Sequence, residues 1–98
     1  MTIDKNADGN KLVVKVSGRL DTMTAPELEK ELRESLSGIT ELVLDFADLE
    51  YISSAGLRVV LGAQKTMNSQ GTMVVKNLTE EVRDVFDITG FTDILTIE

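Results

Sequence analysis

Two adjacent hydroxyl side chains, Ser53 and Ser54, are the residues whose types and placement best suit chemistry in this chain. They follow an acidic segment, residues 48–52, and precede an apolar pattern that is typical of a helix. Ser is a preferred residue at a helix start because its oxygen accepts an N–H of the first turn. The exposed N–H groups and the positive end of the helix dipole also favour a phosphate. The pair therefore predicts either a helix cap or a phosphorylation site.

Nucleophilic catalysis by either serine is a third interpretation, which the composition disfavours. A serine nucleophile needs a base to remove its proton. The chain has no His and no Cys, so imidazole bases, thiol nucleophiles and the usual zinc ligands are lacking. Lys65, a basic residue on the same predicted helix, lies roughly two to three turns from the pair. We therefore expect no enzymatic activity, no catalytic residue, no cofactor and no metal site.

The distribution of charge favours proteins as partners. The chain has 10 Lys and Arg residues against 17 Asp and Glu residues, a formal net charge of -7, and the positive charges are scattered. Nucleic acids and anionic membranes bind concentrated Lys and Arg, so we expect no nucleic-acid partner and no membrane insertion. The sequence shows neither a signal peptide nor an apolar run of membrane-spanning length. These features predict a cytoplasmic location.

The first strands are predicted from alternation and turn chemistry. Residues 11–17 alternate apolar and polar side chains, as a half-buried strand does. The turn Asp8-Gly9-Asn10 predicts that residues 2–6 form the other arm of a hairpin. Residues 41–46 have apolar side chains on both faces, which is typical of a central strand.

A capping box predicts the first helix. Thr24-Ala-Pro-Glu27 has the required spacing, with Thr24 as N-cap and Glu27 reaching back to its N–H. Met23 and Leu28 stand at positions where they would pack together beside this cap. The helix is expected to close near Gly38.

The second half of the chain predicts two further helices and two strands. The second helix begins at the serine pair and runs to about Asn68. Residues 72–76 predict a short strand, and residues 77–89 predict the third helix. Gly90 is placed as a left-handed residue that ends this helix, and residues 94–97 predict a last strand.

These elements follow the order β-β-α-β-α-β-α-β, which predicts an α/β fold. Right-handed crossovers would place the strands in a short mixed sheet with helices mainly on one face. The other face would carry polar strand positions such as Lys15 and Asp45. Because 98 residues have room for one hydrophobic core, residues 1–98 are expected to form a single domain.

A 17-residue stretch, Asp45-Phe-Ala-Asp-Leu-Glu-Tyr-Ile-Ser-Ser-Ala-Gly-Leu-Arg-Val-Val-Leu61, resembles the central signature of STAS domains. These are the bacterial anti-sigma factor antagonists and the related sulfate-transporter domains. Gly18-Arg19-Leu20-Asp21 resembles the family's loop after its second strand, and the resemblance extends over essentially the whole chain. Stand-alone antagonists usually read Asp-Ser-(Ser/Thr/Ala)-Gly-Leu, with phosphorylation of the Ser after Asp. The resemblance therefore implies phosphorylation of Ser54, with Ser53 in the Asp position and as the fallback acceptor.

The resemblance also implies a partner switch in transcription regulation. The unphosphorylated domain would bind an anti-sigma factor that is a serine kinase, and so release the sigma factor. That kinase would use ATP and Mg²⁺ to phosphorylate Ser54, and a metal-dependent serine phosphatase would reverse the modification. ATP and metal would belong to these partners. The alternative is a constitutive STAS adaptor or scaffold subunit in a signalling or transport complex, where both serines only cap the helix.

The expected partner-binding surface surrounds the serine pair. The two small residues after the pair keep the helix start low, so that another protein could approach its backbone. Asp21, in the loop after the second strand, is an expected neighbour of Ser54. Arg58, Gly62 and Lys65 form an exposed strip that either extends this surface or only faces solvent. The full expected set is Asp21, Ser53, Ser54, Ala55, Gly56, Arg58, Gly62 and Lys65.

Overall fold

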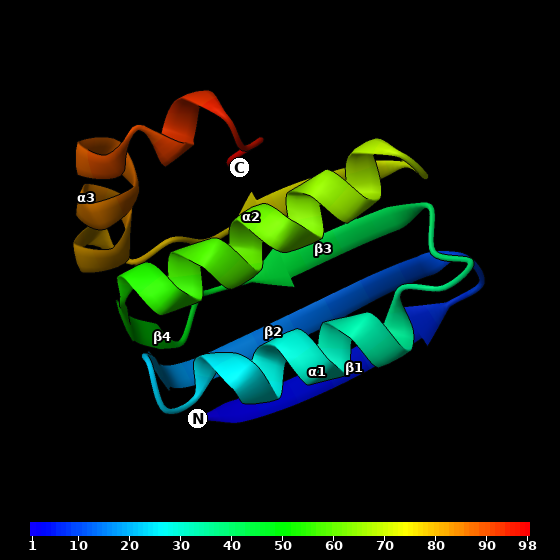
Figure 1. Cartoon of the computed structure of the whole chain (residues 1–98), viewed down its shortest axis with the longest axis horizontal. Coiled ribbons are helices and arrows are strands. Elements are labelled where there is room, and N and C mark those ends of the chain that lie inside the picture. The colour runs from blue at the N-terminus through cyan, green and yellow to red at the C-terminus, as the bar shows by residue number, and fades with distance from the viewer.

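A mixed sheet of five strands organises the chain in the computed structural model, which describes residues 1–98 (Figure 1). Four strands lie side by side in the order β1-β2-β3-β5, with β1 antiparallel to β2 and the other neighbours parallel. The fifth strand, β4, pairs in parallel with the last residues of β2. The strands are β1 (Thr2–Asp8), β2 (Lys11–Leu20), β3 (Glu41–Asp45), β4 (Leu49–Ile52) and β5 (Thr72–Lys76).

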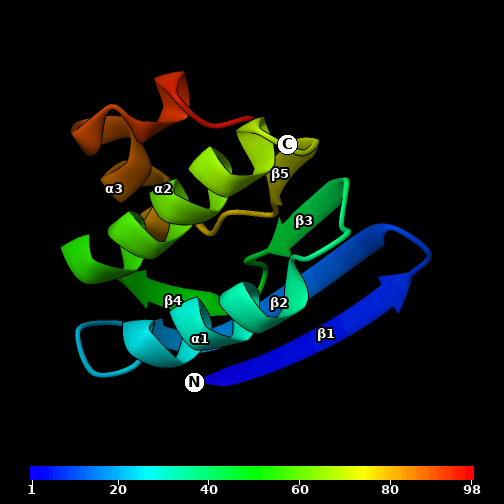
Figure 2. The same ribbon diagram turned by 45° about the vertical axis from the view of Figure 1, so that its right-hand side comes forward.

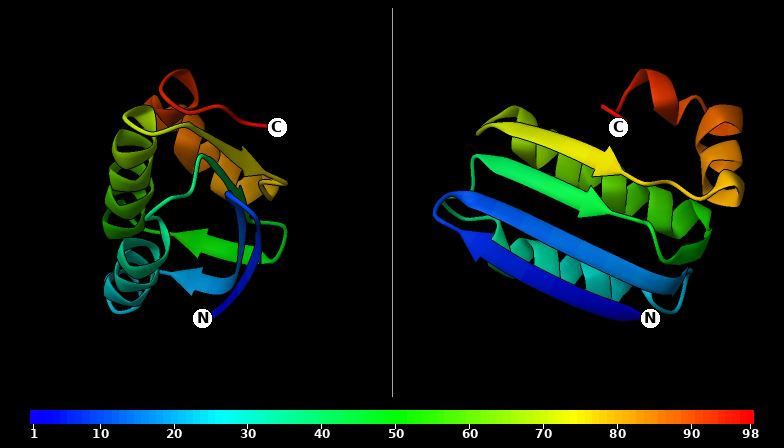
Figure 3. Two further views of the ribbon diagram at one scale, coloured as in Figure 1. Left: turned by 90° about the vertical axis from the view of Figure 1, so that its right-hand side faces the viewer. Right: turned by 180° about the vertical axis from the view of Figure 1, so that it is seen from behind.

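Two helices cover one face of this sheet, which confirms the α/β prediction. Helix α1 (Ala25–Ser35) and helix α2 (Ser54–Asn68) lie side by side (Figure 2), and an edge view shows both on the same side of the strands (Figure 3). Helix α3 (Glu80–Thr89) lies beyond the end of the sheet, where the Thr79 hydroxyl donates to the Leu49 carbonyl. None of the helices combines the length and apolar character that a membrane crossing requires.

One continuous hydrophobic core lies between the two helices and the sheet. It joins 24 buried residues from every helix and from four of the strands. Strand β2 contributes its alternate side chains Leu12, Val14 and Val16, while α1 contributes Leu28 and Leu32. The apolar positions that the sequence assigned to one side of each element therefore meet in a single layer.

Alternating charges cross the open face of the sheet, which the helices leave uncovered. In the strand register, Lys15 lies between Asp4 and Asp45, and Asp45 lies between Lys15 and Lys76. The row ends at Glu98, whose carboxylate is 3.9 Å from the Lys76 ammonium. Opposite charges on neighbouring strands attract weakly at such exposed positions. The positive charges on this face are thus matched within the chain.

The predicted capping box at α1 is wrong. Thr24 occupies the N-cap position, but its side chain accepts no N–H of the helix. Instead Asp21 Oδ1 accepts the N–H groups of Met23 and Thr24, at 3.0 and 3.1 Å. The Thr24 hydroxyl is used inside the loop, where it accepts the Asp21 N–H and donates to the Arg19 carbonyl. Met23 is 87% exposed, so it does not pack against Leu28.

Strand β4 was missed by the sequence prediction, and the expected strand at residues 94–97 is reduced to one bridge between Val75 and Ile97. Strand β2 continues past residue 17 to Leu20, which provides the partner for β4. Gly18 has a φ of 90° and marks the point where the register shifts. Within β4 two exposed residues lie between two buried ones, so its side chains do not alternate and no period of two identifies the strand.

The end of α3 agrees with the sequence prediction. Gly90 has a left-handed φ of 79° and its N–H donates to the Asp87 carbonyl. The ring of Phe91 then folds back, edge to face, 6.3 Å from the ring of Phe86. The helix begins at Glu80, three residues later than expected, because Thr79 in an extended conformation accepts the N–H of residue 82.

Candidate functional site

Ser53 is the N-cap of α2, and both its side chain and its backbone hold the start of the helix. Its backbone is extended, with φ -98° and ψ 175°, and its Oγ accepts the Gly56 N–H at 3.3 Å. Its N–H donates to the Leu20 carbonyl at 2.9 Å, and its carbonyl accepts the Leu57 N–H at 2.9 Å. The residue is half-buried. Ser53 therefore ties the start of α2 to the end of β2.

Ser54 is the first residue of α2, and it is exposed. Its hydroxyl takes no part in the cap, which belongs to Ser53. The N–H groups of the first helical turn have no partners within the helix, and the helix dipole makes this end positive. An added phosphate would therefore meet a favourable field. The structure separates the two serines into one structural hydroxyl and one accessible hydroxyl.

Gly56 has a different purpose from the one that the sequence suggested. It is buried, and a Cβ atom at this position would lie 2.8 Å from Leu20 Cγ and 2.9 Å from Ile52 Cγ1. The lack of a side chain lets α2 pack closely on the ends of β2 and β4. Gly56 therefore offers no surface to a partner, and neighbouring Ala55 is half-buried against the core.

Asp21 is held in the loop that precedes α1, next in sequence to the Leu20 that contacts both Ser53 and Gly56. The hydrogen bond from the Thr24 N–H is the main reason why the pKa of Asp21 lies below its ordinary value. The Thr24 hydroxyl, the Met23 N–H and the Arg19 guanidinium lower the pKa further. The carboxylate thus shapes the loop beside the start of α2 and stays ionised.

The Arg19 guanidinium lies over the Tyr51 ring at this end of the molecule. The Arg19 guanidinium carbon lies 4.2 Å from the centre of the Tyr51 ring, and Arg19 Nε is 3.8 Å from an Asp21 oxygen. Tyr51 is 40% exposed, whereas the rings of Phe46 and Phe86 are fully buried. No local sequence pattern marks this pair. Knowing that Arg19 and Tyr51 are register partners of β2 and β4 would have predicted it.

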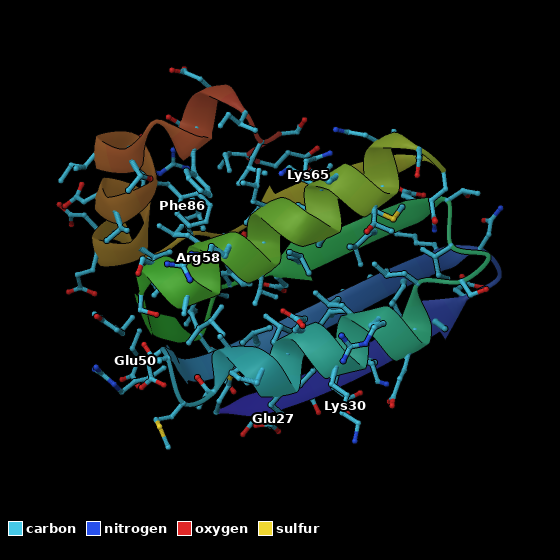
Figure 4. The ribbon with its side chains drawn as sticks, viewed as in Figure 1. Glu27, Lys30, Glu50, Arg58, Lys65 and Phe86 are labelled. Atoms are coloured by element: carbon cyan, nitrogen blue, oxygen red, sulfur yellow. The ribbon has the colours of Figure 1, made fainter.

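A groove of about 450 Å³ runs between α1 and α2, on the helix-covered side of the molecule. Two of the expected strip residues, Arg58 and Gly62, line it, while Lys65 lies farther along the exposed side of α2 (Figure 4). Arg33 and Gln70 also line the groove but were not among the expected residues, because no local pattern shows which helices lie side by side. The lining comprises Glu29, Leu32, Arg33, Leu36, Ser37, Arg58, Val59, Gly62, Ala63, Thr66 and Gln70.

Unpaired positive charge is concentrated on α2. Six of the 10 Lys and Arg side chains of the chain form ion pairs with carboxylates. Arg58 and Lys65 are among the four that do not, and α2 contains no Asp or Glu. In a chain of net charge -7, this helix therefore presents a local surface that suits an acidic partner.

Comparisons of the sequence with known proteins agree with this geometry. A model of the STAS domain family matches residues 2–98. BtrV of Bordetella bronchiseptica, described as an anti-sigma factor antagonist, is 41% identical over 99% of this chain and 84% of its own length. The anti-sigma-B factor antagonist of Bacillus subtilis is 32% identical over 99% of this chain and 90% of its own length.

Solved structures show the same fold. An anti-sigma factor antagonist from Mycobacterium paratuberculosis has a TM-score of 0.89 at 24% identity, covering 98% of this chain and 83% of its own. The antagonist SpoIIAA in its unphosphorylated form has a TM-score of 0.77 at 17% identity, covering 99% of this chain and 87% of its own. SpoIIAA of Bacillus is also solved in the phosphorylated form, with a TM-score of 0.77 at 18% identity and coverage of 99% and 91%.

Proposed function

Because the chain belongs to the STAS domain family, we propose that it is an anti-sigma factor antagonist whose partner binding is switched off by phosphorylation of Ser54. The observation that carries this proposal is the exposed Ser54 hydroxyl at the N-terminus of α2, beside a Ser53 that already caps the helix. The single core is consistent with residues 1–98 acting as one STAS domain.

The proposed modification is a phosphoryl transfer that the partner kinase catalyses. Ser54 Oγ attacks the γ-phosphorus of ATP, the bond from that phosphorus to the β–γ bridging oxygen breaks, and ADP leaves. The hydroxyl proton passes to a base of the kinase. This chain supplies the accessible nucleophile and the favourable field of α2, while ATP and Mg²⁺ are bound by the kinase. The chain itself catalyses no step.

The energy of the switch must come mainly from the interface. A phosphate adds about 1.5 to 2 negative charges, and its own helix terminus favours it by about 0.3 to 2 kcal/mol. A 100-fold loss of affinity requires about 2.7 kcal/mol in the complex. Repulsion and desolvation of the phosphate in the docked state supply this loss. No refolding of the domain is required.

The proposed docking surface centres on Ser54 and continues along the exposed side of α2. Arg58 and Lys65 provide the unpaired charges that suit an acidic anti-sigma factor, and Gly62 leaves the helix surface low between them. Asp21 contributes through the shape of its loop. Gly56 supports the surface from below and makes no contact with the partner.

Reversal completes the proposed cycle. A metal-dependent serine phosphatase hydrolyses the phosphoserine, which restores the neutral hydroxyl and the ability to bind the anti-sigma factor. The domain would act in the cytoplasm, where sigma factors and RNA polymerase meet. Both the kinase and the phosphatase must reach the first turn of α2, and the exposure of Ser54 is compatible with that access.

Intact-mass measurement tests the acceptor directly. The purified protein, Ser54→Ala and Ser53→Ala are each incubated with the partner anti-sigma factor and ATP, after thermal melts have shown that all three are folded. We expect one phosphoryl group on the wild type and on Ser53→Ala, and none on Ser54→Ala. Normal modification of Ser54→Ala would move the acceptor to another residue. A wild type that binds the partner but is never modified would support the constitutive adaptor instead.

A further inference from the structure

We propose that Arg58 is the internal partner of the phosphate on Ser54, so that phosphorylation withdraws Arg58 from the groove between α1 and α2. This inference rests on the proposed function and adds a second component to its regulation. In the unmodified state Arg58 is free to bind an acidic group of the partner. In the modified state the phosphate on the same chain competes for that guanidinium.

The spacing of the two residues permits this pairing. Ser54 and Arg58 stand at positions i and i+4 of α2, which is continuous from Ser54 to Asn68. Residues with this spacing have Cβ atoms about 5 to 6 Å apart on the same side of a helix. Long side chains in helices lean toward the N-terminus, over the preceding turn. The Arg58 guanidinium can therefore reach a phosphate on Ser54 without a change in the backbone.

Arg58 is also available for such a partner. It is exposed and forms no ion pair, and α2 offers it no carboxylate because the helix has no Asp or Glu. The other arginine of the groove, Arg33, differs in this respect, since its guanidinium lies 3.3 Å from Glu29. Of the two arginines that line the groove, Arg58 is therefore the one without an ion pair. A phosphate favours a planar guanidinium that can donate two parallel hydrogen bonds.

Capture of Arg58 would change the docking surface in two ways at once. The phosphate brings negative charge to the first turn of α2, and the groove loses its free positive charge. An acidic partner segment that used Arg58 would then face both repulsion and a missing ion pair. Phosphorylation would then reduce the affinity for the partner by more than the added phosphate charge alone.

The decisive test uses phosphoserine inserted at position 54 during synthesis of the full chain, so that no kinase is needed. The second pKa of the phosphate is measured by ³¹P NMR in this protein and in the same protein carrying Arg58→Gln or Lys65→Gln. An ordinary phosphoserine titrates near pH 6. We expect Arg58→Gln to raise the phosphate pKa by about 0.3 unit or more.

Lys65→Gln is the matched control, because it removes an equal charge from the same helix 11 positions beyond Ser54. It should leave the phosphate pKa unchanged. Arg58→Lys keeps the positive charge, so the phosphate pKa should lie between those of the unsubstituted protein and Arg58→Gln. Equal phosphate pKa values in the unsubstituted protein and Arg58→Gln would overturn the capture. So would an equal rise caused by Lys65→Gln, because the effect would then be one of general charge.

Partner binding provides a second readout. The fold loss of affinity caused by phosphoserine at position 54 is compared with and without Arg58→Gln. Capture predicts a smaller loss in Arg58→Gln, because the groove has no free cation left to withdraw. An equal fold loss in both backgrounds contradicts it. Failure of the kinase to modify Ser54 would refute the proposed function, while the ³¹P titration would still decide the capture.

Discussion

Ser53 and Ser54 have the same side chain but different surroundings, which the backbone conformation determines. Ser53 is extended and directs its oxygen to the Gly56 N–H, while Ser54 begins the helix and faces solvent. The sequence placed a helix start at this pair but left capping and phosphorylation open for both residues. Only the position of the first helical residue separates the two roles, since a helix that began one residue later would make Ser54 the cap.

Substitution at each serine should separate these roles in stability. Ser53→Ala removes the N-cap and should lower the free energy of unfolding by about 1 kcal/mol, whereas Ser53→Asp keeps a capping oxygen and should stay near the wild type. Ser54→Ala should change it by less than about 0.5 kcal/mol, as is usual for an exposed site. Urea unfolding measures all three. A larger cost at Ser54 than at Ser53 would show that the cap is assigned to the wrong serine.

Two glycines of α2 should respond oppositely to alanine. Gly56→Ala would place a Cβ against Leu20 and Ile52 at distances below 3.0 Å, so we expect a loss of about 1 to 3 kcal/mol from overpacking. A Cβ added at Gly62 would have no neighbouring atom within 4 Å, so Gly62→Ala should stabilise the helix by about 0.5 to 1 kcal/mol. Thermal melts of both variants provide the comparison. A stabilising Gly56→Ala would disprove the close packing of α2 on the sheet.

At the scale of elements, the predictions that depended on long periodic patterns were confirmed. The strand predicted at residues 11–17 and α2 each have enough residues for their period to identify them. Turn residues identified the hairpin, and apolar side chains on both faces identified β3. Strand β4 has only four residues, of which Glu50 and Tyr51 are exposed, so its identity depends on pairing with β2. The capping box failed because Asp21, outside the four-residue motif, accepts the Thr24 N–H that Glu27 was expected to accept. The Thr24 hydroxyl bonds instead to the Asp21 N–H and the Arg19 carbonyl. Local patterns do not record such competitors.

A side chain beyond α2 fastens the end of α1. The amide nitrogen of Gln70 donates to the carbonyls of Leu36 and Ile39, both at 2.7 Å. Gln70→Ala leaves these carbonyls without that donor, and we expect a loss of about 1 kcal/mol in the free energy of unfolding. Lys65→Ala, at an exposed position of α2 without an ion pair, is the control and should cost less than about 0.5 kcal/mol. Equal urea midpoints would contradict the role of Gln70.

The whole molecule divides its charge between two faces. On the open face of the sheet, cations and carboxylates alternate across the strands, whereas α2 on the helix face carries cations alone. Composition gave the net charge but not this division, because the register of the strands and the neighbours of α2 are three-dimensional facts. Helix α2, unlike the neighbouring α1 with its four Glu residues, is therefore the better surface for an acidic partner.

Acid should destabilise the fold by protonating carboxylates whose pKa is lower in the native state than in the unfolded chain. At Asp45, partial burial raises the pKa, but this effect is outweighed by hydrogen bonds from the Ala47 N–H and the Asn77 amide and by the nearby charges of Lys15 and Lys76. The pKa of Asp45 therefore lies below its ordinary value of 3.8. A carboxyl with a lowered pKa stabilises the fold above its unfolded pKa. That contribution is lost as pH falls through the native pKa. The melting temperature should therefore decrease as the pH is lowered below about 4.

Asp45→Asn isolates this contribution. Asparagine keeps the shape of the side chain but has no proton to bind, so the variant should be less stable than the wild type near neutral pH. The difference between the two melting temperatures should narrow as the pH is lowered. A constant difference across the acidic range would show that Asp45 does not contribute to the acid sensitivity of the fold.

One affinity measurement tests most directly whether phosphorylation of Ser54 controls partner binding. The dissociation constant for the partner anti-sigma factor is measured by titration calorimetry for the unmodified chain and for the chain with phosphoserine at position 54. We predict that phosphoserine weakens binding about 100-fold or more, equivalent to about 2.7 kcal/mol. Equal dissociation constants for the two forms would show that phosphorylation of Ser54 does not control partner binding.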